Sequence, residues 1–129
     1  MKPLGTHLIA EFTYCTKSIL NDLKLLERIL KAAIKEVGLH CEKIVSHQFR
    51  PIGVTSVAII SESHISIHTY PETHHASIDI FTCTPNPQIH QQLLRLLIEK
   101  LKPRTVRLLE IARGNLIDVK KISGCTNHH

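Results

Sequence analysis

Short segments in which hydrophobic and polar residues alternate predict that much of the chain forms β-strands. The clearest is 76–82, where Ala76, Ile78 and Ile80 would face one side of a sheet. The segment 54–60 is apolar at consecutive positions, which is typical of a central strand. The remaining strand-like segments are 7–12, 43–49, 63–70 and 106–112.

Two other segments carry hydrophobic residues at spacings of three and four, which predicts amphipathic helices. The first runs from Ile19 to Val37 and is capped by Ser18. The second carries its hydrophobic stripe over 89–101, with Asn86 and Pro87 as N-cap and first-turn residue.

The predicted order of elements is therefore β-α-β-β-β-β-α-β. Consecutive strands favour hairpins, and each helix needs the sheet to cover its hydrophobic stripe. We expect an α+β fold in which helices pack on one face of a mostly antiparallel sheet, a two-layer sandwich. The other face of the sheet also needs a cover, and dimerisation is one way to supply it.

Composition is that of a globular protein. The 129 residues fit one domain, 1–129, and 43% hydrophobic and 21% charged residues are ordinary values. No apolar run approaches the roughly 18 residues that cross a bilayer, and no signal-like core follows Met1, so we expect a cytoplasmic protein without membrane partners. The net charge of +5 is scattered and only 4% of residues are aromatic, which argues against nucleic-acid binding.

The cysteines and histidines match no recognised metal motif. The cysteines lie far apart without a C-x-x-C pair, so we expect free thiols at Cys15, Cys41, Cys83 and Cys125. Histidine side chains could converge on a metal, but their spacing fits no known ligand pattern, and no metal is expected: His64, His68, His74 and His75.

The segment 61–72 concentrates hydroxyl, imidazole and carboxylate groups. Only about two residues separate the strands on either side of its start, which predicts a tight hairpin with Glu62 and Ser63 at its tip. In the strand that follows, Ile65 and Ile67 would face one side of the sheet and polar residues the other: His64, Ser66 and His68.

Three roles are open for Ser63 from the residues alone. It could be a turn serine bonded to its own backbone. A hydrolase nucleophile has no support, because no G-x-S-x-G elbow is present. Its hydroxyl could also attack the carbonyl of Glu62, and the resulting ester can eliminate and hydrolyse to a pyruvoyl group. That reaction needs a base, and His68 on the same hairpin is a candidate. Considered alone, however, a histidine in a strand is more often structural, and Cys83 is more often a small buried hydrophobic residue.

Three stretches of the sequence resemble the prokaryotic S-adenosylmethionine decarboxylase proenzymes. The most specific is Glu-Ser-His-Ile-Ser-Ile-His-Thr-Tyr-Pro-Glu at 62–72, followed by Ala-Ser-Ile-Asp-Ile-Phe-Thr-Cys at 76–83. The others are Leu4-Gly5-x-His7-Leu8-x-x-Glu11 and Phe49-x-Pro51-x-Gly53-Val54. Order and spacing agree from residue 4 to residue 115, which is most of the chain.

The resemblance implies a proenzyme that cuts itself between Glu62 and Ser63. The products would be a β chain, 1–62, and an α chain, 63–129, in which Ser63 has become a covalent pyruvoyl cofactor. A pyruvoyl carbonyl forms a Schiff base with the amino group of an amino acid and acts as an electron sink, which suits a decarboxylase.

Individual roles also follow from the resemblance. His68 corresponds to the base that assists processing, Thr55 to a hydroxyl that helps it, and Cys83 to the proton donor in catalysis. Thr55 stands where many relatives have serine. Family members are dimers of such α/β heterodimers, which is the oligomer expected here.

The substrate implied is S-adenosylmethionine, converted to S-adenosylmethioninamine and CO2 for spermidine and other polyamine biosynthesis. Phe49 would flank the adenine and the sulfonium, because an aromatic face attracts a cation. Glu72 would hold the ribose hydroxyls. Tyr70 would also lie at the substrate, where many relatives have tryptophan, and 73–75 and Thr84 depart from the usual family residues.

These departures keep alternatives open. One is a pyruvoyl-dependent decarboxylase of arginine or a related amino acid, although Phe49 and Glu72 favour a substrate with a nucleoside. Another is an unprocessed binding or regulatory homologue, against which the joint presence of Ser63, His68 and Cys83 argues. A thiol enzyme that uses Cys83 and His68 is the weakest of the three.

Overall fold

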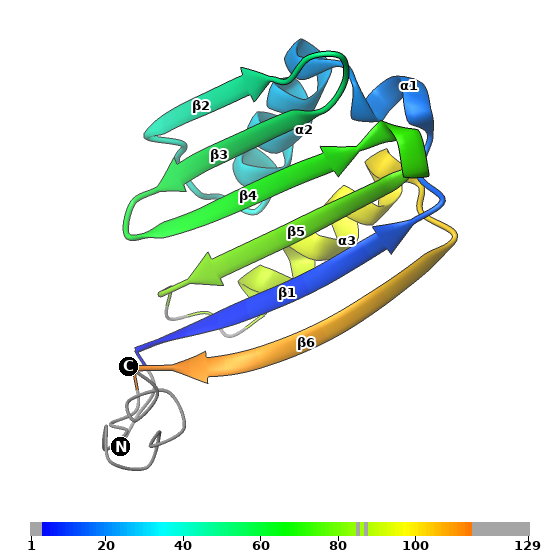
Figure 1. Ribbon diagram of the computed structural model, residues 1–129. Helices are drawn as coiled ribbons and strands as arrows, with labels where there is room; N and C mark the ends of the chain where they lie inside the picture. Colours follow the sequence, from blue (N-terminus) through cyan, green and yellow to red (C-terminus); the bar gives the residue numbers. More distant parts are fainter. Residues whose placement is uncertain (1–3, 85, 87, 115–129) are drawn as a thin grey trace, which may run out of the picture.

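The computed structural model describes residues 4–84, 86 and 88–114. Its centre is a six-stranded sheet in the order β2-β3-β4-β5-β1-β6, with every neighbouring pair antiparallel (Figure 1). The strands are β1 Gly5–Thr13, β2 Lys43–Gln48, β3 Val54–Ile60, β4 Ser63–Tyr70, β5 His75–Thr82 and β6 Thr105–Arg113.

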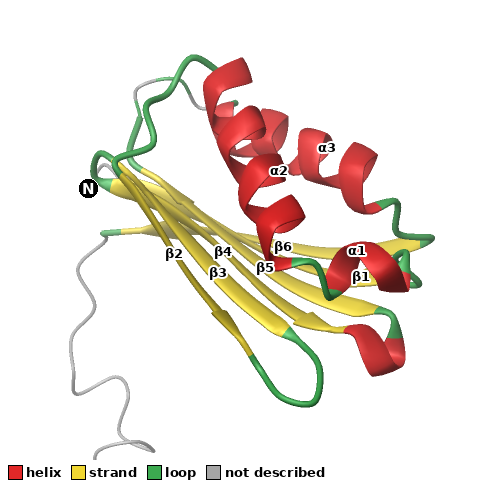
Figure 2. Ribbon diagram, turned by 90° about the horizontal axis from the view of Figure 1, so that it is seen from above, coloured by secondary structure: helices red, strands yellow, loops and turns green. Residues whose placement is uncertain are grey.

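The helices form the second layer. They are α1 Lys17–Leu20, α2 Leu23–Glu36 and α3 Ile89–Leu101, and a short 3-10 turn, η1 Pro71–Thr73, follows β4. Figure 2 shows that α1, α2 and α3 lie on one face of the sheet, and in the described part of the chain no helix covers the opposite, open face. The predicted α+β class, with helices on one face of an antiparallel sheet, is therefore confirmed.

The core lies between the helices and the sheet. Alternate residues of each strand point toward the helices and are buried, as the alternating pattern predicted. Truncating one such large side chain to alanine would cost about 2–5 kcal/mol, because it removes buried surface and leaves a cavity. Fully buried members of this core include Leu8, Phe12, Leu26, Leu30, Ile65, Ile67, Ile80, Leu93 and Leu97.

The prediction of one continuous helix over 19–37 is wrong. The chain forms α1 and α2, separated by a turn at Asn21 and Asp22. The Asp22 side chain accepts a hydrogen bond from the backbone N–H of Leu25 at 3.0 Å and so caps α2. Aspartate and asparagine favour such positions because their side chains compete with the helix for backbone hydrogen bonds. Ser18, the predicted cap, lies inside α1.

The predicted cap of the last helix is wrong as well. α3 begins at Ile89 with Gln88 in the N-cap position, and the Asn86 side chain instead accepts the backbone N–H of Gln88 at 2.9 Å. Pro87 and Cys125 lie outside the described residues. Within the described residues, Cys15, Cys41 and Cys83 are free thiols, as expected. None of the helices in this part of the chain is long and apolar enough to cross a membrane.

Candidate functional site

The turn between β3 and β4 consists of Ser61 and Glu62, with Ile60 paired opposite Ser63. The backbone φ of Ser61 is +56°, in the left-handed region that a residue with a side chain enters at a cost of about 1–2 kcal/mol. The tight hairpin predicted here is therefore present, but its tip is Ser61 and Glu62 rather than Glu62 and Ser63, because Ser63 already pairs with Ile60 in the sheet. Backbone strain is stored next to the Glu62–Ser63 peptide bond.

Ser63 and Cys83 meet at this hairpin. The antiparallel pairing of β4 with β5 brings together residues that are twenty positions apart in sequence. The backbone N–H of Cys83 donates to Oγ of Ser63 at 2.9 Å, and the Cys83 thiol lies 3.9 Å from the carbonyl oxygen of Glu62. The serine hydroxyl, the thiol and the Glu62–Ser63 bond thus share one small volume.

A cavity of about 230 Å³ opens at the same place. Ser63 itself is only 4% exposed, whereas Cys83 is partly exposed. Leu39, which lines the cavity, was missed in the sequence, where its only signal is its position after the glycine that follows α2. The lining residues are Leu39, Ile60, Ser61, Glu62, Ser63, Cys83 and Thr84.

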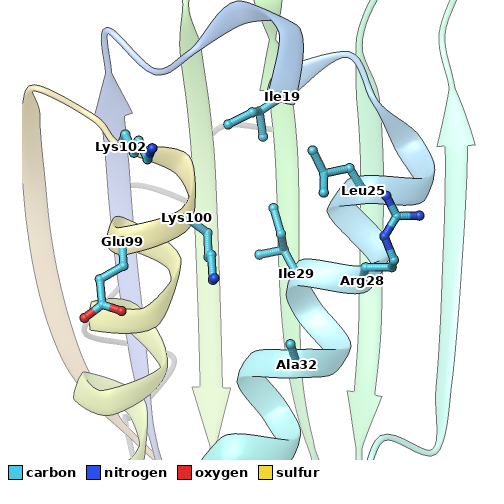
Figure 3. Close-up of a pocket in the computed structure, with 8 residues that line it drawn as sticks. All are labelled: Ile19, Leu25, Arg28, Ile29, Ala32, Glu99, Lys100 and Lys102. Atoms are coloured by element: carbon cyan, nitrogen blue, oxygen red, sulfur yellow. The ribbon is translucent and has the colours of Figure 1, made fainter.

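A larger cavity, of about 430 Å³, lies in the helix layer between α2 and α3 (Figure 3). Ile19, Ile29 and Ala32 form part of its apolar wall, and Lys100 and Lys102 lie across from them. None of the candidate site residues predicted from the sequence lines it. The chemistry of the groups at the β3–β4 hairpin, rather than cavity size, therefore places the candidate site.

His68 and Thr55 lie elsewhere, on the open face. They are paired across β3 and β4, and Oγ1 of Thr55 is 3.1 Å from Nδ1 of His68. His68 is five residues beyond Ser63 on one strand, about 16 Å at roughly 3.3 Å per residue. An odd separation also puts the two side chains on opposite faces of the strand. Within one chain, the structure does not bring His68 to Ser63.

The predicted substrate-binding residues are at the His68 end of the sheet. Phe49 directly follows β2 and is 48% exposed, with its ring 4.7 Å from that of His47. Tyr70 is the last residue of β4, and Glu72 lies two residues later, in η1. Both side chains are exposed. The predicted site residues therefore form two groups at opposite ends of the sheet.

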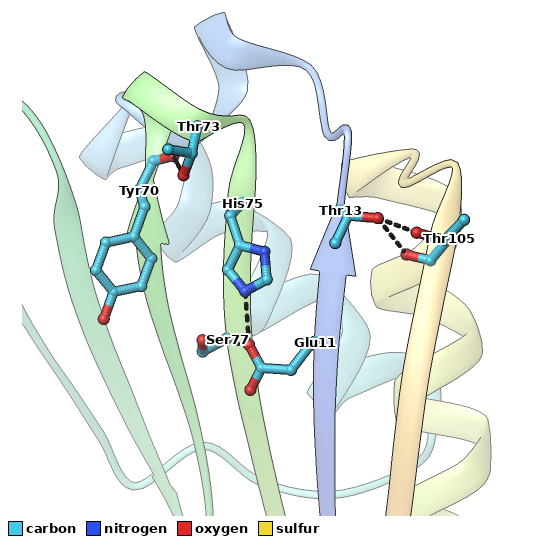
Figure 4. A network of polar contacts seen from close by, with 7 residues as sticks. All are labelled: Glu11, Thr13, Tyr70, Thr73, His75, Ser77 and Thr105. Carbon is cyan, nitrogen blue, oxygen red and sulfur yellow. Dashed lines mark hydrogen bonds and ion pairs between the residues drawn. The ribbon is translucent and has the colours of Figure 1, made fainter.

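Two carboxylates, each bonded to a histidine and a serine, lie on the open face between the two ends of the sheet. Oε1 of Glu11 is 2.6 Å from Nε2 of His75 and accepts the hydroxyl of Ser77 at 2.6 Å (Figure 4). In a similar arrangement, Asp79 accepts from the hydroxyl of Ser66 and lies 3.0 Å from a His7 ring nitrogen. No role for these groups was predicted. In the described residues, no three histidine, cysteine or carboxylate side chains converge to hold a metal ion.

The sequence model of the S-adenosylmethionine decarboxylase family matches residues 6–114. The chain belongs to this family. Among its relatives is the S-adenosylmethionine decarboxylase proenzyme of Moorella thermoacetica, 43% identical over 88% of this chain and 90% of the relative. The proenzyme of Methanococcus maripaludis is 41% identical over 95% of this chain and 98% of its own length.

A solved structure agrees with the family assignment. The adenosylmethionine decarboxylase of Aquifex aeolicus is 28% identical and superimposes with a TM-score of 0.84, over 92% of this chain and 97% of that chain. The resemblance noted in the sequence is thereby confirmed over nearly the whole chain. None of these relatives supports the alternative of an arginine decarboxylase.

Proposed function

We propose that this S-adenosylmethionine decarboxylase is a cytoplasmic, self-processing enzyme that uses a pyruvoyl group formed from Ser63. It releases CO2 from S-adenosylmethionine and yields S-adenosylmethioninamine for polyamine synthesis. The observation that carries the proposal is the meeting of the Glu62–Ser63 bond and Cys83 at one strained hairpin. The family match supports the choice of substrate.

Self-cleavage begins with Oγ of Ser63, which attacks the carbonyl carbon of Glu62 while its proton passes to a base. The C–N bond breaks, and the chain continues through an ester and a free amine. Elimination then releases Glu62 as a carboxylate and leaves a dehydroalanine, which one water molecule hydrolyses to a pyruvoyl group and ammonia. The products are 1–62 and 63–129. The hydrogen bond from the Cys83 N–H orients Oγ at the start, and relief of strain at Ser61 favours the break.

The residues at the hairpin fit a pyruvoyl group formed in place. Ser63 lies almost fully buried in the cavity, and a backbone N–H already points toward its side-chain oxygen. Such a group supplies a carbonyl that condenses with the substrate amine and accepts the electron pair released with CO2. Cys83 donates the proton that replaces the carboxylate, since its thiol lies beside the cleavage point.

The other predicted residues need a second copy of the chain. Thr55, His68, Phe49, Tyr70 and Glu72 are at the opposite end of the sheet from Ser63. A two-fold axis between two open faces exchanges the ends of the sheet, so that the β3–β4 hairpin of one subunit meets the His68 end of the other. Because the Ser63 side chain faces the helix layer, the partner's His68 reaches it past the tip of the hairpin. In that dimer of α/β heterodimers, the partner subunit's His68, assisted by its threonine, is the base for processing.

The open face has the character of such an interface. The carboxylates of Glu11 and Asp79 are already hydrogen-bonded to histidine and hydroxyl groups within the chain, so covering them leaves those hydrogen bonds in place. Exposed hydrophobic side chains lie on the same face near both edges of the sheet, and covering them is favourable. They are Val45, Ile59, Leu109 and Ile111.

Intact mass and a CO2-release assay test the proposal. We expect two chains split after Glu62, the second lacking the amino nitrogen of Ser63, and CO2 from carboxyl-labelled S-adenosylmethionine but not from labelled arginine. A Ser63→Ala variant, purified in the same way, should remain one inactive chain. A wild-type chain that stays at full mass after long incubation would overturn self-processing, and release from arginine alone would overturn the substrate.

A further inference from the structure

The β2–β3 loop, residues 49–53, is held by a side chain from the helix layer. Oδ1 of Asn21 accepts the backbone N–H of Gly53 at 2.9 Å and a side-chain N–H of Gln48 at 3.0 Å. The same Gln48 nitrogen, which carries two N–H groups, also lies 2.9 Å from the carbonyl oxygen of Gly53 and 3.3 Å from that of Phe49. The N–H of Phe49 also donates to the Gly53 carbonyl at 2.7 Å. Both ends of the loop therefore meet at Asn21.

Asn21 is in turn anchored to the sheet. It directly follows Leu20, whose carbonyl oxygen accepts the Thr69 hydroxyl at 2.7 Å. The oxygen of that hydroxyl accepts the backbone N–H of Val54 at 2.8 Å, and Thr69 is 5% exposed. A chain of polar contacts, buried at Thr69 and exposed at Asn21, thus runs from the end of β4, through the turn between α1 and α2, to the loop that carries Phe49.

Apart from the contact of its ring with that of His47, the position of Phe49 depends on this loop, because half of the side chain is exposed. The side chain is 48% exposed and borders Gly53, where an added Cβ would lie 3.9 Å from the Phe49 Cβ and 3.3 Å from the Thr69 carbonyl oxygen. The φ of Gly53 is +116°, a conformation that residues with side chains rarely adopt. An exposed aromatic on a free loop would lose conformational entropy on binding, whereas a held loop has already lost it.

We propose that Asn21 is a positioning residue for the nucleoside half of the substrate. By holding both ends of loop 49–53, it orders Phe49 before the substrate arrives. The inference rests on the proposed function, in which Phe49 flanks the adenine and sulfonium. Asn21 does not touch the substrate, and its loss should weaken nucleoside binding without slowing self-cleavage, because its side chain bonds Gln48 and Gly53 and none of the groups proposed for processing.

Four variants of the processed enzyme separate this role from general stability. Asn21→Leu keeps the side-chain size and removes the acceptor, and Asn21→Asp keeps the acceptor. Asp22→Ala is the matched control, because it removes the adjacent helix cap without touching the loop. Phe49→Ala removes the aromatic ring itself. The probe is 5′-methylthioadenosine, a neutral nucleoside thioether, whose Kd is measured by equilibrium dialysis alongside KM and kcat for S-adenosylmethionine.

We expect Asn21→Leu and Phe49→Ala to raise the Kd and KM about tenfold, the effect of losing one or two net hydrogen bonds or a ring contact, with kcat nearly unchanged. Asn21→Asp and Asp22→Ala should bind like the wild type, and all four should be cleaved at Ser63. A wild-type Kd for Asn21→Leu, or an equal loss in Asp22→Ala, would overturn the positioning role while the proposed function stands. A wild-type Kd for Phe49→Ala would overturn the proposed role of Phe49 and this inference with it.

Discussion

Processing across the dimer interface can be tested by combining two variants that cannot process themselves. Ser63→Ala lacks the nucleophile, and His68→Ala lacks the base. Within one chain these residues are about 16 Å apart along β4, at roughly 3.3 Å per residue, and on opposite faces. Proton transfer to a base needs heavy atoms within about 3 Å, or one bridging water. If His68 is the base for processing in this fold, it must therefore come from a second subunit.

The assay is co-expression of the two variants with different affinity tags. If subunits assemble at random, about half of the His68→Ala chains pair with a Ser63→Ala chain, and in that pair an intact serine meets an intact histidine of the partner. We expect each variant alone to stay at full mass and up to about half of the His68→Ala chains to be cut in the mixture. Ser63→Ala chains should never be cut.

A partner that carries both substitutions is the control, because it can form the dimer without supplying a base. Mixed dimers isolated by both tags that show no cleavage would refute the interface role of His68. Cleavage of His68→Ala alone, at the wild-type rate, would show that His68 is not the base in any subunit.

Three further predictions concern single side chains. Cys83→Ala keeps the backbone N–H that contacts Ser63, so mass should show normal cutting while CO2 release falls about 100-fold or more; loss of both would contradict the separate roles. Burial raises the pKa of the Cys15 thiol from 9.0 to about 11, so its stability contribution, complete below pH 9, should be lost toward pH 11. That loss, up to about 2–3 kcal/mol, should appear in urea unfolding of the Ser63→Ala precursor and be absent after Cys15→Ala. Glu110→Ala should cost about 1–3 kcal/mol in the same assay, because it removes the 2.6 Å partner of the buried His90 ring. Glu110→Gln keeps a side-chain oxygen that can accept from His90, so a loss in Glu110→Ala no larger than in Glu110→Gln would contradict this.

Side chains alternate between the two faces of a strand, and this alternation explains much of what could be predicted from the sequence. Alternation correctly placed Ile65 and Ile67 on the covered face and His68 on the other, and the spacing of hydrophobic residues located the helices. The same alternation implies that Ser63 and His68, an odd number of positions apart, cannot face one another within a strand. The expectation that His68 would serve Ser63 from the same hairpin overlooked this consequence.

Other features depend on contacts that no local pattern encodes. β1 lies between β5 and β6, and His7 contacts Asp79, which is 72 positions away in sequence. The break between α1 and α2 was hidden because the hydrophobic spacing continues across Asn21 and Asp22. Leu39 reaches the cavity only because of the path that the chain takes from α2 to β2.

The strand order would give the proposed cut before Ser63 a lasting effect on folding. The segment 1–62 supplies β1, β2 and β3, and the segment from 63 onward supplies β4, β5 and β6, so the two products are interleaved in one sheet. The proposed cleavage would sever the peptide bond between them, while the ladders β3–β4, β5–β1 and β1–β6 would still join them. The precursor refolds as a single molecule, whereas the mature enzyme, once unfolded, must bring two fragments together, and its recovery depends on concentration. Self-cleavage would therefore make folding irreversible in one respect. The uncut chain folds as a single molecule, but after the cut the unfolded fragments can regain the fold only by associating with each other.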